Sequence, residues 1–364
     1  MSRKTISSGG LSAGRRILII GLSGAATLLA AAMFVALWAA WVFQGVGPAA
    51  REGDATTVSL RRGASVPEIA STLERAGVVR SAAVFVTAAK LTGAARSLQA
   101  GEYLIPSHAS MARVLADIRD GQVVRRQITI PEGMTSEMAA ELLSREPALT
   151  GVAPAPPEGA ILPETYQFEK GEDRAAVLKR MMDARDEVVT MLWNRRQPGL
   201  PFTTVEEAMT LASIVEKETG IASERPRVAA VFVNRLRKGI RLQSDPTIIY
   251  GISGGRPLGR GIRASEIAAP TPYNTYRIDG LPPTPIANPG RAAIAAVLDP
   301  PQTDELFFVA NGKGGHVFAA TLDEHNANVA KWRSVERSKA KGTGESVPVG
   351  EGGETDPASI KAEP

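Results

Sequence analysis

A long apolar segment lies near the N-terminus, where the residues from Ile17 to Gln44 carry no charge. A helix needs about 20 such residues to cross a bilayer, so this run is long enough to span one with some tilt. Trp38 and Trp41 fall near its end, where aromatic side chains favour the membrane interface. A cleaved signal peptide has an apolar core of only roughly 7–15 residues. The pattern therefore predicts an uncleaved transmembrane helix over 17–44, with a cleaved signal or a buried soluble helix as the alternatives.

The charges before this segment predict its orientation. Arg3, Lys4, Arg15 and Arg16 precede the apolar run. Because Lys and Arg are enriched on the cytoplasmic side of membrane helices, residues 1–16 should be cytoplasmic and everything after Gln44 extracytoplasmic. We therefore expect a single-pass protein of the inner (plasma) membrane with a periplasmic or extracytoplasmic body.

Short strand and helix patterns alternate after a Gly- and Pro-containing linker at 45–55. Strand patterns occur in TVSL, GEYLI and VVRRQITI. Apolar residues recur at helical spacing in the segments that begin at Ser65, Ala82, Ser110 and Thr135. The order predicts a small α+β module over 56–150. It either binds glycan or only holds the next domain away from the membrane.

The pattern changes at a Pro-rich boundary, PAPPEG (154–159), near the start of a second predicted domain over 151–333. A long helix is expected from Arg174 to Arg195. The tail over 334–364 is rich in Gly, Ser and Glu and has almost no large apolar residue. Such a segment cannot bury enough surface to offset the entropy of ordering, so we expect it to be disordered. The fold class predicted for the exported part is α+β.

Composition removes several kinds of chemistry. The chain has 364 residues, a formal charge of +4 and no cysteine. Absent cysteine excludes disulfides, thiolate metal sites and cysteine nucleophiles. The Lys and Arg residues form no run with interleaved aromatics, so no nucleic-acid partner is indicated. Of the three histidines, His316 and His325 lie in a stretch without a third ligand, so no metal site is predicted.

The helix pattern in TTVEEAMTLASIVEKETG carries the densest polar signal. Ala208, Leu211, Ala212 and Val215 form one apolar stripe, and Glu216 and Glu218 lie near its two edges. Two residues apart on a helix, these carboxyls cannot face each other. A carboxyl on a partly apolar face near a helix C-terminus has a raised pKa, as a general acid requires. From spacing alone, two solvated surface acids in the last turn are the favoured interpretation.

Three long segments carry a family resemblance: LASIVEKETGIASERPRVAAVFVNRLRKGIRLQSDPTIIYGI, TPYNTYRIDGLPPTPIANPG and FFVANGKGGHVFAATLDEHN. They resemble the signature of the endolytic murein transglycosylases, the YceG-like family, over roughly 56–332. The resemblance implies a LysM-like module over 56–150, a lysozyme-like mixed α+β catalytic domain, and no cofactor. It also implies cleavage of peptidoglycan by a single acid, because the substrate's own 6-hydroxyl replaces the second carboxylate of a hydrolase.

The same resemblance implies roles for individual residues. Glu218 is expected to be the catalytic acid, with Glu216 and Asp245 in possible supporting roles. The substrate-binding residues expected from the LQSDPT, YNTY and GGH segments are Gln243, Ser244, Thr247, Tyr273, Asn274, Thr275, Tyr276 and His316. Each has a purely structural alternative: Asp245 can cap a turn before Pro246, and the YNTY hydroxyls can be satisfied within a buried turn.

Three functions remain open from the sequence. The first is an endolytic transglycosylase that leaves 1,6-anhydroMurNAc ends and terminates nascent strands, with glycan strands, the inner membrane and peptidoglycan synthases as partners. The second is a membrane-tethered muramidase, which would need a second carboxylate such as Asp245. The third is a non-enzymatic peptidoglycan-binding scaffold.

Overall fold

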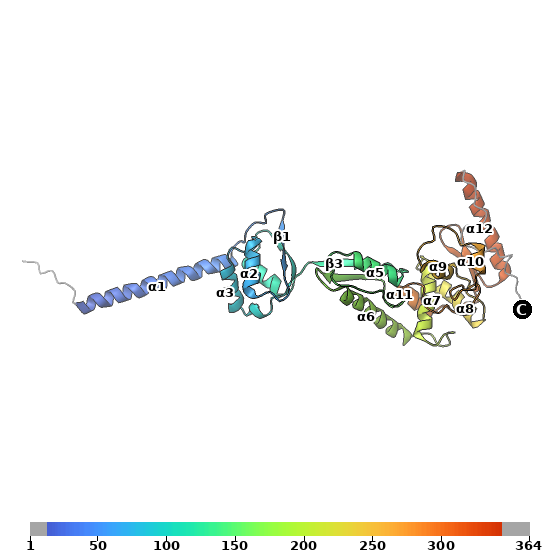
Figure 1. Ribbon diagram of the computed structural model, residues 1–364, viewed down its shortest axis with the longest axis horizontal. Coiled ribbons are helices and arrows are strands. Elements are labelled where there is room, and N and C mark those ends of the chain that lie inside the picture. The colour runs from blue at the N-terminus through green and yellow to red at the C-terminus, as the bar shows by residue number, and fades with distance from the viewer. Residues whose placement is uncertain (1–12, 344–364) are drawn as a thin grey trace, which may run out of the picture. The chain divides into compact units, whose positions relative to one another are not determined.

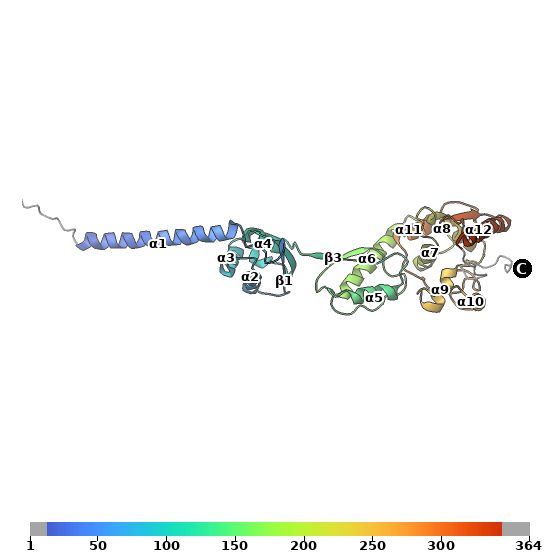
Figure 2. The same ribbon diagram turned by 90° about the horizontal axis from the view of Figure 1, so that it is seen from above.

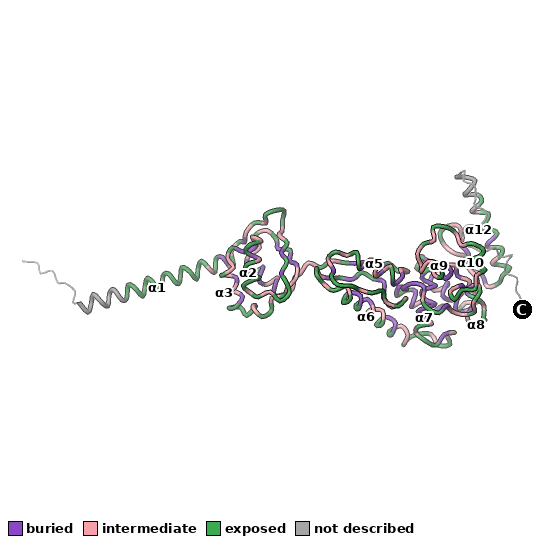
Figure 3. The backbone as a smooth tube through the Cα atoms, in the orientation of Figure 1, coloured by how far each residue is buried: buried purple, intermediate pink, exposed green. Residues whose placement is uncertain are grey.

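The apolar run near the N-terminus forms helix α1 (Ala13–Gln44) in the computed structural model, which describes residues 13–343. Its stretch Leu22–Gln44 is long and apolar enough to cross a membrane. Most of its described side chains are exposed (Figure 3). An apolar helix without a protein core around it is suited to a bilayer, so α1 fits a single-pass anchor. Arg3 and Lys4 lie outside the described residues.

The chain divides into two units after Arg125. In the first, β1 (Ala55–Leu60) pairs antiparallel with β2 (Gly101–Pro106) in a two-stranded sheet. Helices α2 (Val66–Arg75), α3 (Ala82–Leu91) and α4 (Met111–Arg119) share one apolar core with this sheet (Figures 1 and 2). A short 3₁₀ helix spans Ala94–Arg96. Ser65, Ser81 and Ser110 accept hydrogen bonds from backbone N–H groups in the first turns of the three helices. These elements match those expected from the sequence.

The end of α1 belongs to the core of the first unit. Val42 is only 6% exposed and packs in the same cluster as the residues of α2, α3 and α4. Beyond the helix, Gly47 N donates to His108 O at 3.1 Å, and Ala50 N donates to Ser107 Oγ at 3.0 Å. The guanidinium of Arg80 lies 5.4 Å from the Trp41 ring. Residues 45–50, the first part of the predicted linker, are therefore tied to the module by hydrogen bonds.

The second unit begins with two strands and two helices that share a small apolar core. It contains β3 (Arg125–Thr129), α5 (Ser136–Arg145), β4 (Thr165–Glu169) and α6 (Arg174–Trp193). The two strands pair with each other, and α5 and α6 lie beside β3 in both views (Figures 1 and 2). One apolar cluster joins residues of all four elements. Because 126–149 pack with 161–181, the observed division at 125 differs from the boundary expected at 150.

Helix α7 (Val205–Glu218) lies at the centre of the larger core of this unit. It contacts α8 (Arg225–Arg237) and α11 (Arg291–Leu298) on one side and α9 (Asp245–Ser253) on the other (Figure 2). Every residue over 208–216 is buried, and Figure 3 shows purple, buried backbone around α7. The single apolar stripe expected from the sequence is therefore only part of a helix that is buried on all sides.

The remaining elements close the far end of the second unit. They are α10 (Ala264–Ala268), the antiparallel pair β5 (Phe307–Ala310) and β6 (His316–Ala319), and α12 (Leu322–Thr343). Helix α12 includes 334–343, so the disorder predicted from 334 is wrong for these residues. The rest of the predicted tail, 344–364, lies outside the described residues. The described chain is a mixed α+β fold with an N-terminal apolar helix.

Candidate active site

The acid pair of the VEKE segment lies at the C-terminal end of α7. The helix starts with a capping box, in which Thr204 accepts from Glu207 N and the Glu207 carboxylate accepts from Thr204 N. It ends at Glu218, because Thr219 turns to an extended conformation with φ −141° and ψ 127°. Both acids thus lie in the last turn, where the negative end of the helix dipole disfavours a carboxylate.

Glu216 is enclosed in an ion pair. Its side chain is only 3% exposed and lies 3.1 Å from the guanidinium of Arg225. Its other oxygen accepts from Gly290 N at 2.8 Å, and Arg225 also bonds Glu132 at 3.1 Å. Burial raises the pKa of Glu216, while the N–H of Gly290 and the charge of Arg225 oppose that rise. With both oxygens occupied and almost no exposed surface, Glu216 holds α7, α8 and the 288–290 segment together.

Glu218 has a different environment. The residue is half-buried, and the Ser244 hydroxyl donates to its Oε1. Burial raises the pKa of Glu218 to about 7, and the nearby negative charge of Asp245 adds to the rise. The Ser244 hydrogen bond and the charge of Arg235 oppose it. Glu218 is therefore a carboxyl that can carry a proton near neutral pH and is still accessible.

Asp245 is the first residue of α9, directly after the serine that contacts Glu218. The Tyr276 hydroxyl donates to its Oδ1 at 2.7 Å. Burial raises the pKa of Asp245, and the bond from Tyr276 opposes the rise. Asp245 and Tyr276 are both half-buried. The structure thus brings Glu218, Ser244, Asp245 and Tyr276 into one connected cluster.

Buried hydroxyls fix the turn that carries Ser244. Ser244 N donates to Thr275 Oγ1 at 2.9 Å, and the hydroxyls of Thr247 and Thr275 are 2.9 Å apart. Ser244, Thr247 and Thr275 are at most 1% exposed. Gln243 precedes them with φ +53°, a left-handed conformation that is uncommon for residues other than glycine. Of the LQSDPT residues expected to bind substrate, only Gln243 keeps accessible surface. Ser244 and Thr247 instead position the turn.

The YNTY loop likewise contains both buried residues and partly exposed ones. Asn274 is fully buried, and its amide donates to the carbonyls of Glu266, Ile267 and Ala269 at 2.7–3.2 Å. It cannot reach a sugar in this conformation, and neither can buried Thr275, so both hold the loop. Tyr273 and Tyr276 are half-buried and remain accessible. The Tyr273 hydroxyl lies 2.7 Å from Thr284 Oγ1.

His316 forms a separate pair. Its Nδ1 lies 2.7 Å from Glu224 Oε2, and its backbone N–H donates to the other oxygen of Glu224 at 2.9 Å. The ring also meets Phe308 edge-on, with centroids 5.4 Å apart. The structure therefore ties His316 to the start of α8 through Glu224, rather than to the Glu218 cluster.

Several residues that position the acids were not singled out by the sequence. Arg225 and the backbone N–H of Gly290 both donate to the Glu216 carboxylate. Asn288 is a fully buried amide that bonds Met134 O at 3.0 Å and Glu158 at 3.2 Å. Arg235 donates to Leu306 O at 2.7 Å and Leu242 O at 2.8 Å. Buried positions of this kind depend on contacts between distant segments.

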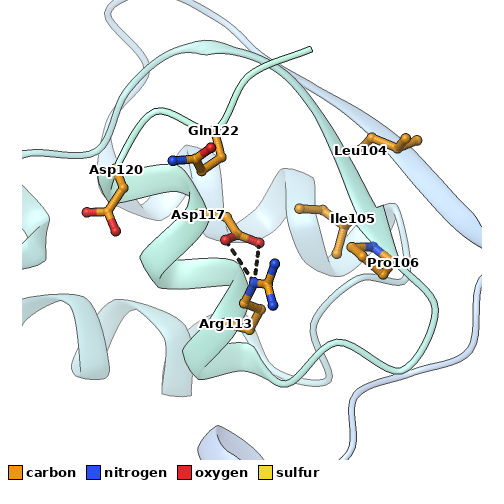
Figure 4. A pocket seen from close by; sticks show the side chains of 7 residues that line it. All are labelled: Leu104, Ile105, Pro106, Arg113, Asp117, Asp120 and Gln122. Carbon is orange, nitrogen blue, oxygen red and sulfur yellow. Dashed lines mark hydrogen bonds and ion pairs between the residues drawn. The ribbon is translucent and has the colours of Figure 1, made fainter.

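A cavity of about 370 Å³ lies in the first unit. Figure 4 shows β2 residues on one side and α4 residues on the other, with Arg113 and Asp117 bonded at 2.9 Å. Its lining residues are Leu104, Ile105, Pro106, Arg113, Asp117, Asp120 and Gln122. The cavity holds no acid of the VEKE segment, so the candidate chemistry and this cavity belong to different units.

A family model and similar curated proteins point to one family. Residues 58–331 match the family described as YceG-like. The endolytic murein transglycosylase of Bacillus subtilis strain 168 is 30% identical over 319 residues, which are 78% of this chain and 87% of that protein. The endolytic murein transglycosylase of Streptococcus pneumoniae strain R6 is 29% identical over 76% of this chain, which spans 58% of that longer protein. A crystal structure of a YceG-like protein from Listeria monocytogenes has 27% identity and a TM-score of 0.48, covering 75% of this chain and 98% of that chain.

Proposed function

This chain belongs to the YceG-like family, and from that premise we propose that it is a peptidoglycan lytic transglycosylase that cuts glycan strands internally. Glu218 is the catalytic acid. The bond cut is the β-1,4 bond between the MurNAc C1 and the GlcNAc O4. The products are a strand with a free GlcNAc end and a strand that ends in 1,6-anhydroMurNAc.

One carboxyl suffices for this reaction. Protonated Glu218 gives its proton to the GlcNAc O4 as the C1–O4 bond breaks. The 6-hydroxyl of the same MurNAc attacks C1, a C1–O6 bond forms, and the hydroxyl proton passes to the Glu218 carboxylate. The acid is restored and no water is consumed. A hydrolase would need a second carboxylate to activate water or attack C1.

The observation that supports this role is the contrast between the two acids of VEKE. Glu216 has an arginine partner and a side chain only 3% exposed. Glu218 is half-buried and bonded to a neutral hydroxyl, and burial raises its pKa to about 7. A glycosidic acid must be accessible and must hold its proton near neutral pH. Only Glu218 of this pair meets both conditions.

The test is mass spectrometry of products from purified, undigested glycan strands. The full chain in detergent should generate 1,6-anhydroMurNAc ends, and Glu218→Gln should generate none. Products with reducing ends would instead indicate a muramidase, for which Asp245 is the neighbouring second carboxylate. Unchanged strand length with both wild type and Glu218→Gln would leave only a binding scaffold and would refute the proposal.

We also propose where the enzyme acts. Helix α1 would anchor it in the inner membrane with the N-terminus in the cytoplasm and a lysozyme-like catalytic domain outside. There it would meet strands as peptidoglycan synthases release them, and its cuts would terminate their growth. A strain with Glu218→Gln at the native locus should have longer glycan strands. Unchanged strand length in that strain would exclude the terminating role without affecting the chemistry.

The first unit would hold glycan as a LysM-like module. Its cavity is lined by Asp117, Asp120 and Gln122, side chains that can bond sugar hydroxyls and amides. The full chain with Asp117→Ala and Gln122→Ala should pellet less well with purified cell-wall sacculi than wild type does. Equal pelleting would favour the alternative, in which the module only spaces the catalytic domain from the membrane.

A further inference from the structure

The cluster around Glu218 contains a second carboxyl whose role the single-acid reaction does not require. Asp245 is half-buried, begins α9, and accepts the Tyr276 hydroxyl at 2.7 Å. Its chain neighbour Ser244 donates to Glu218. Partial burial of a carboxyl is costly unless it is hydrogen-bonded, and the bond from Tyr276 offsets that cost here.

We propose that Asp245, held by Tyr276, is a positioning residue that keeps a negative charge beside Glu218 and thereby maintains the acid in its proton-donating form. The inference rests on the proposed role of Glu218 as the catalytic acid. In this arrangement Tyr276 is a holder of Asp245, in addition to any contact it makes with a sugar.

The geometry fixes Asp245 relative to Glu218 from two sides. On the α9 side, the backbone N–H groups of Gln243 and Ser244 donate to Thr275 at 3.1 Å and 2.9 Å, which ties the turn to the YNTY loop. On the loop side, Tyr276 is the next residue after Thr275 and reaches Asp245 itself. The turn and the loop are therefore tied to each other, and the Asp245 carboxyl cannot rotate away without breaking the bond from Tyr276.

The other charges near Glu218 either lower its pKa, opposite to the effect of Asp245, or lie away from its carboxyl. Arg235 on α8 is the nearby cation, but its guanidinium is engaged by the carbonyls of Leu306 and Leu242. Its charge favours the ionised form of Glu218, as the Ser244 hydroxyl does. On α7 itself, Lys217 is exposed and bonds Gly133 O at 3.3 Å. Burial is the largest effect that raises the pKa of Glu218, and Asp245 is the charged group that adds to it against Ser244 and Arg235.

Two substitutions should shift the alkaline limb of the pH–rate profile in opposite directions. Asp245→Asn removes the negative charge, so the alkaline limb of the pH–rate profile should move to lower pH by about one unit, the usual scale for a neighbouring charge. Ser244→Ala removes a hydrogen bond to the ionised form, so the limb should move to higher pH. Tyr276→Phe frees Asp245 to take up a proton and should shift the limb in the same direction as Asp245→Asn, but by less.

The measurement is the initial rate of 1,6-anhydroMurNAc formation by the full chain in detergent, from pH 4.5 to 9. The matched control is Tyr166→Phe, which removes another buried tyrosine hydroxyl, bonded to Leu162 O at 2.7 Å, in β4. Its limb should coincide with that of wild type. A shift to lower pH in Asp245→Asn together with a shift to higher pH in Ser244→Ala supports the proposal, because loss of stability cannot move a limb in two directions.

Two results would overturn it. If Asp245→Asn and wild type share the same limb while Glu218→Gln is inactive, the proposed function stands and the positioning role is wrong. If folded Asp245→Asn is inactive at every pH, Asp245 takes part in the reaction directly. An active Glu218→Gln is a different failure, since it removes the proposed function itself.

Discussion

Replacement of Glu218 by glutamine should stabilise the second unit at alkaline pH. Glutamine has nearly the same shape and keeps an oxygen that can accept the Ser244 hydroxyl. It differs from glutamate in that it cannot ionise. The variant therefore isolates the cost of holding a charged carboxyl at this buried position, which is the cost that a general acid must impose on its own fold.

The size of the effect follows from the pKa. Burial raises the pKa of Glu218 from 4.5 to about 7. Below pH 4.5 the carboxyl is protonated in both the folded and the unfolded chain, so it makes no difference to stability. Between 4.5 and 7 the unfolded chain loses the proton first, and the free energy of unfolding of wild type falls. Above 7 the loss is complete, at about 3 kcal/mol, because one pKa unit corresponds to about 1.4 kcal/mol.

The assay is urea unfolding of the full chain in detergent, with pulsed hydrogen exchange of α7 as the readout for the second unit. Relative to wild type, Glu218→Gln should gain stability between pH 4.5 and 8. Glu206→Gln, at an exposed position of the same helix, serves as control and should show no such gain. If the free energies of unfolding of wild type and Glu218→Gln differ by the same amount at every pH in this range, the reasoning is refuted.

Three further outcomes are expected. Strand cleavage by wild type should be lost as the pH rises through about 7, because the reaction needs protonated Glu218; a rate that increases through this range would contradict the assigned acid. Glu216→Ala should destabilise the second unit by about 3 kcal/mol, since it leaves Arg225 buried with only Glu132 as a partner, yet its specific activity at low temperature should exceed that of Glu218→Gln. Gly47→Ala should destabilise the first unit by about 1–3 kcal/mol in thermal unfolding, because its Cβ would lie 1.9 Å from Ala109 O; an unchanged midpoint would show that the junction with α1 is loose.

The sequence predicted the local elements well because their signals are local. The helices after Ser65 and Ser110 start where a serine side chain can cap them, and α3 spans the predicted Ala82–Leu91. The long uncharged run gave the apolar helix α1. It did not reveal that the end of α1 packs into the first unit, since that contact joins Val42 and Gly47 to residues far along the chain.

What the sequence by itself determined is the position of two acids near the end of one helix, and through the long VEKE, LQSDPT and YNTY segments, the family. Spacing alone could not distinguish Glu216 from Glu218, since it places both at the edges of the same apolar stripe, and only the family resemblance implied Glu218. The tertiary structure gives the two acids different environments, because α8 brings Arg225 to Glu216, whereas α9 brings Ser244 and Asp245 to Glu218. The ionisation of a carboxyl depends on the charges and the water around it, and in a folded chain those neighbours come from distant segments.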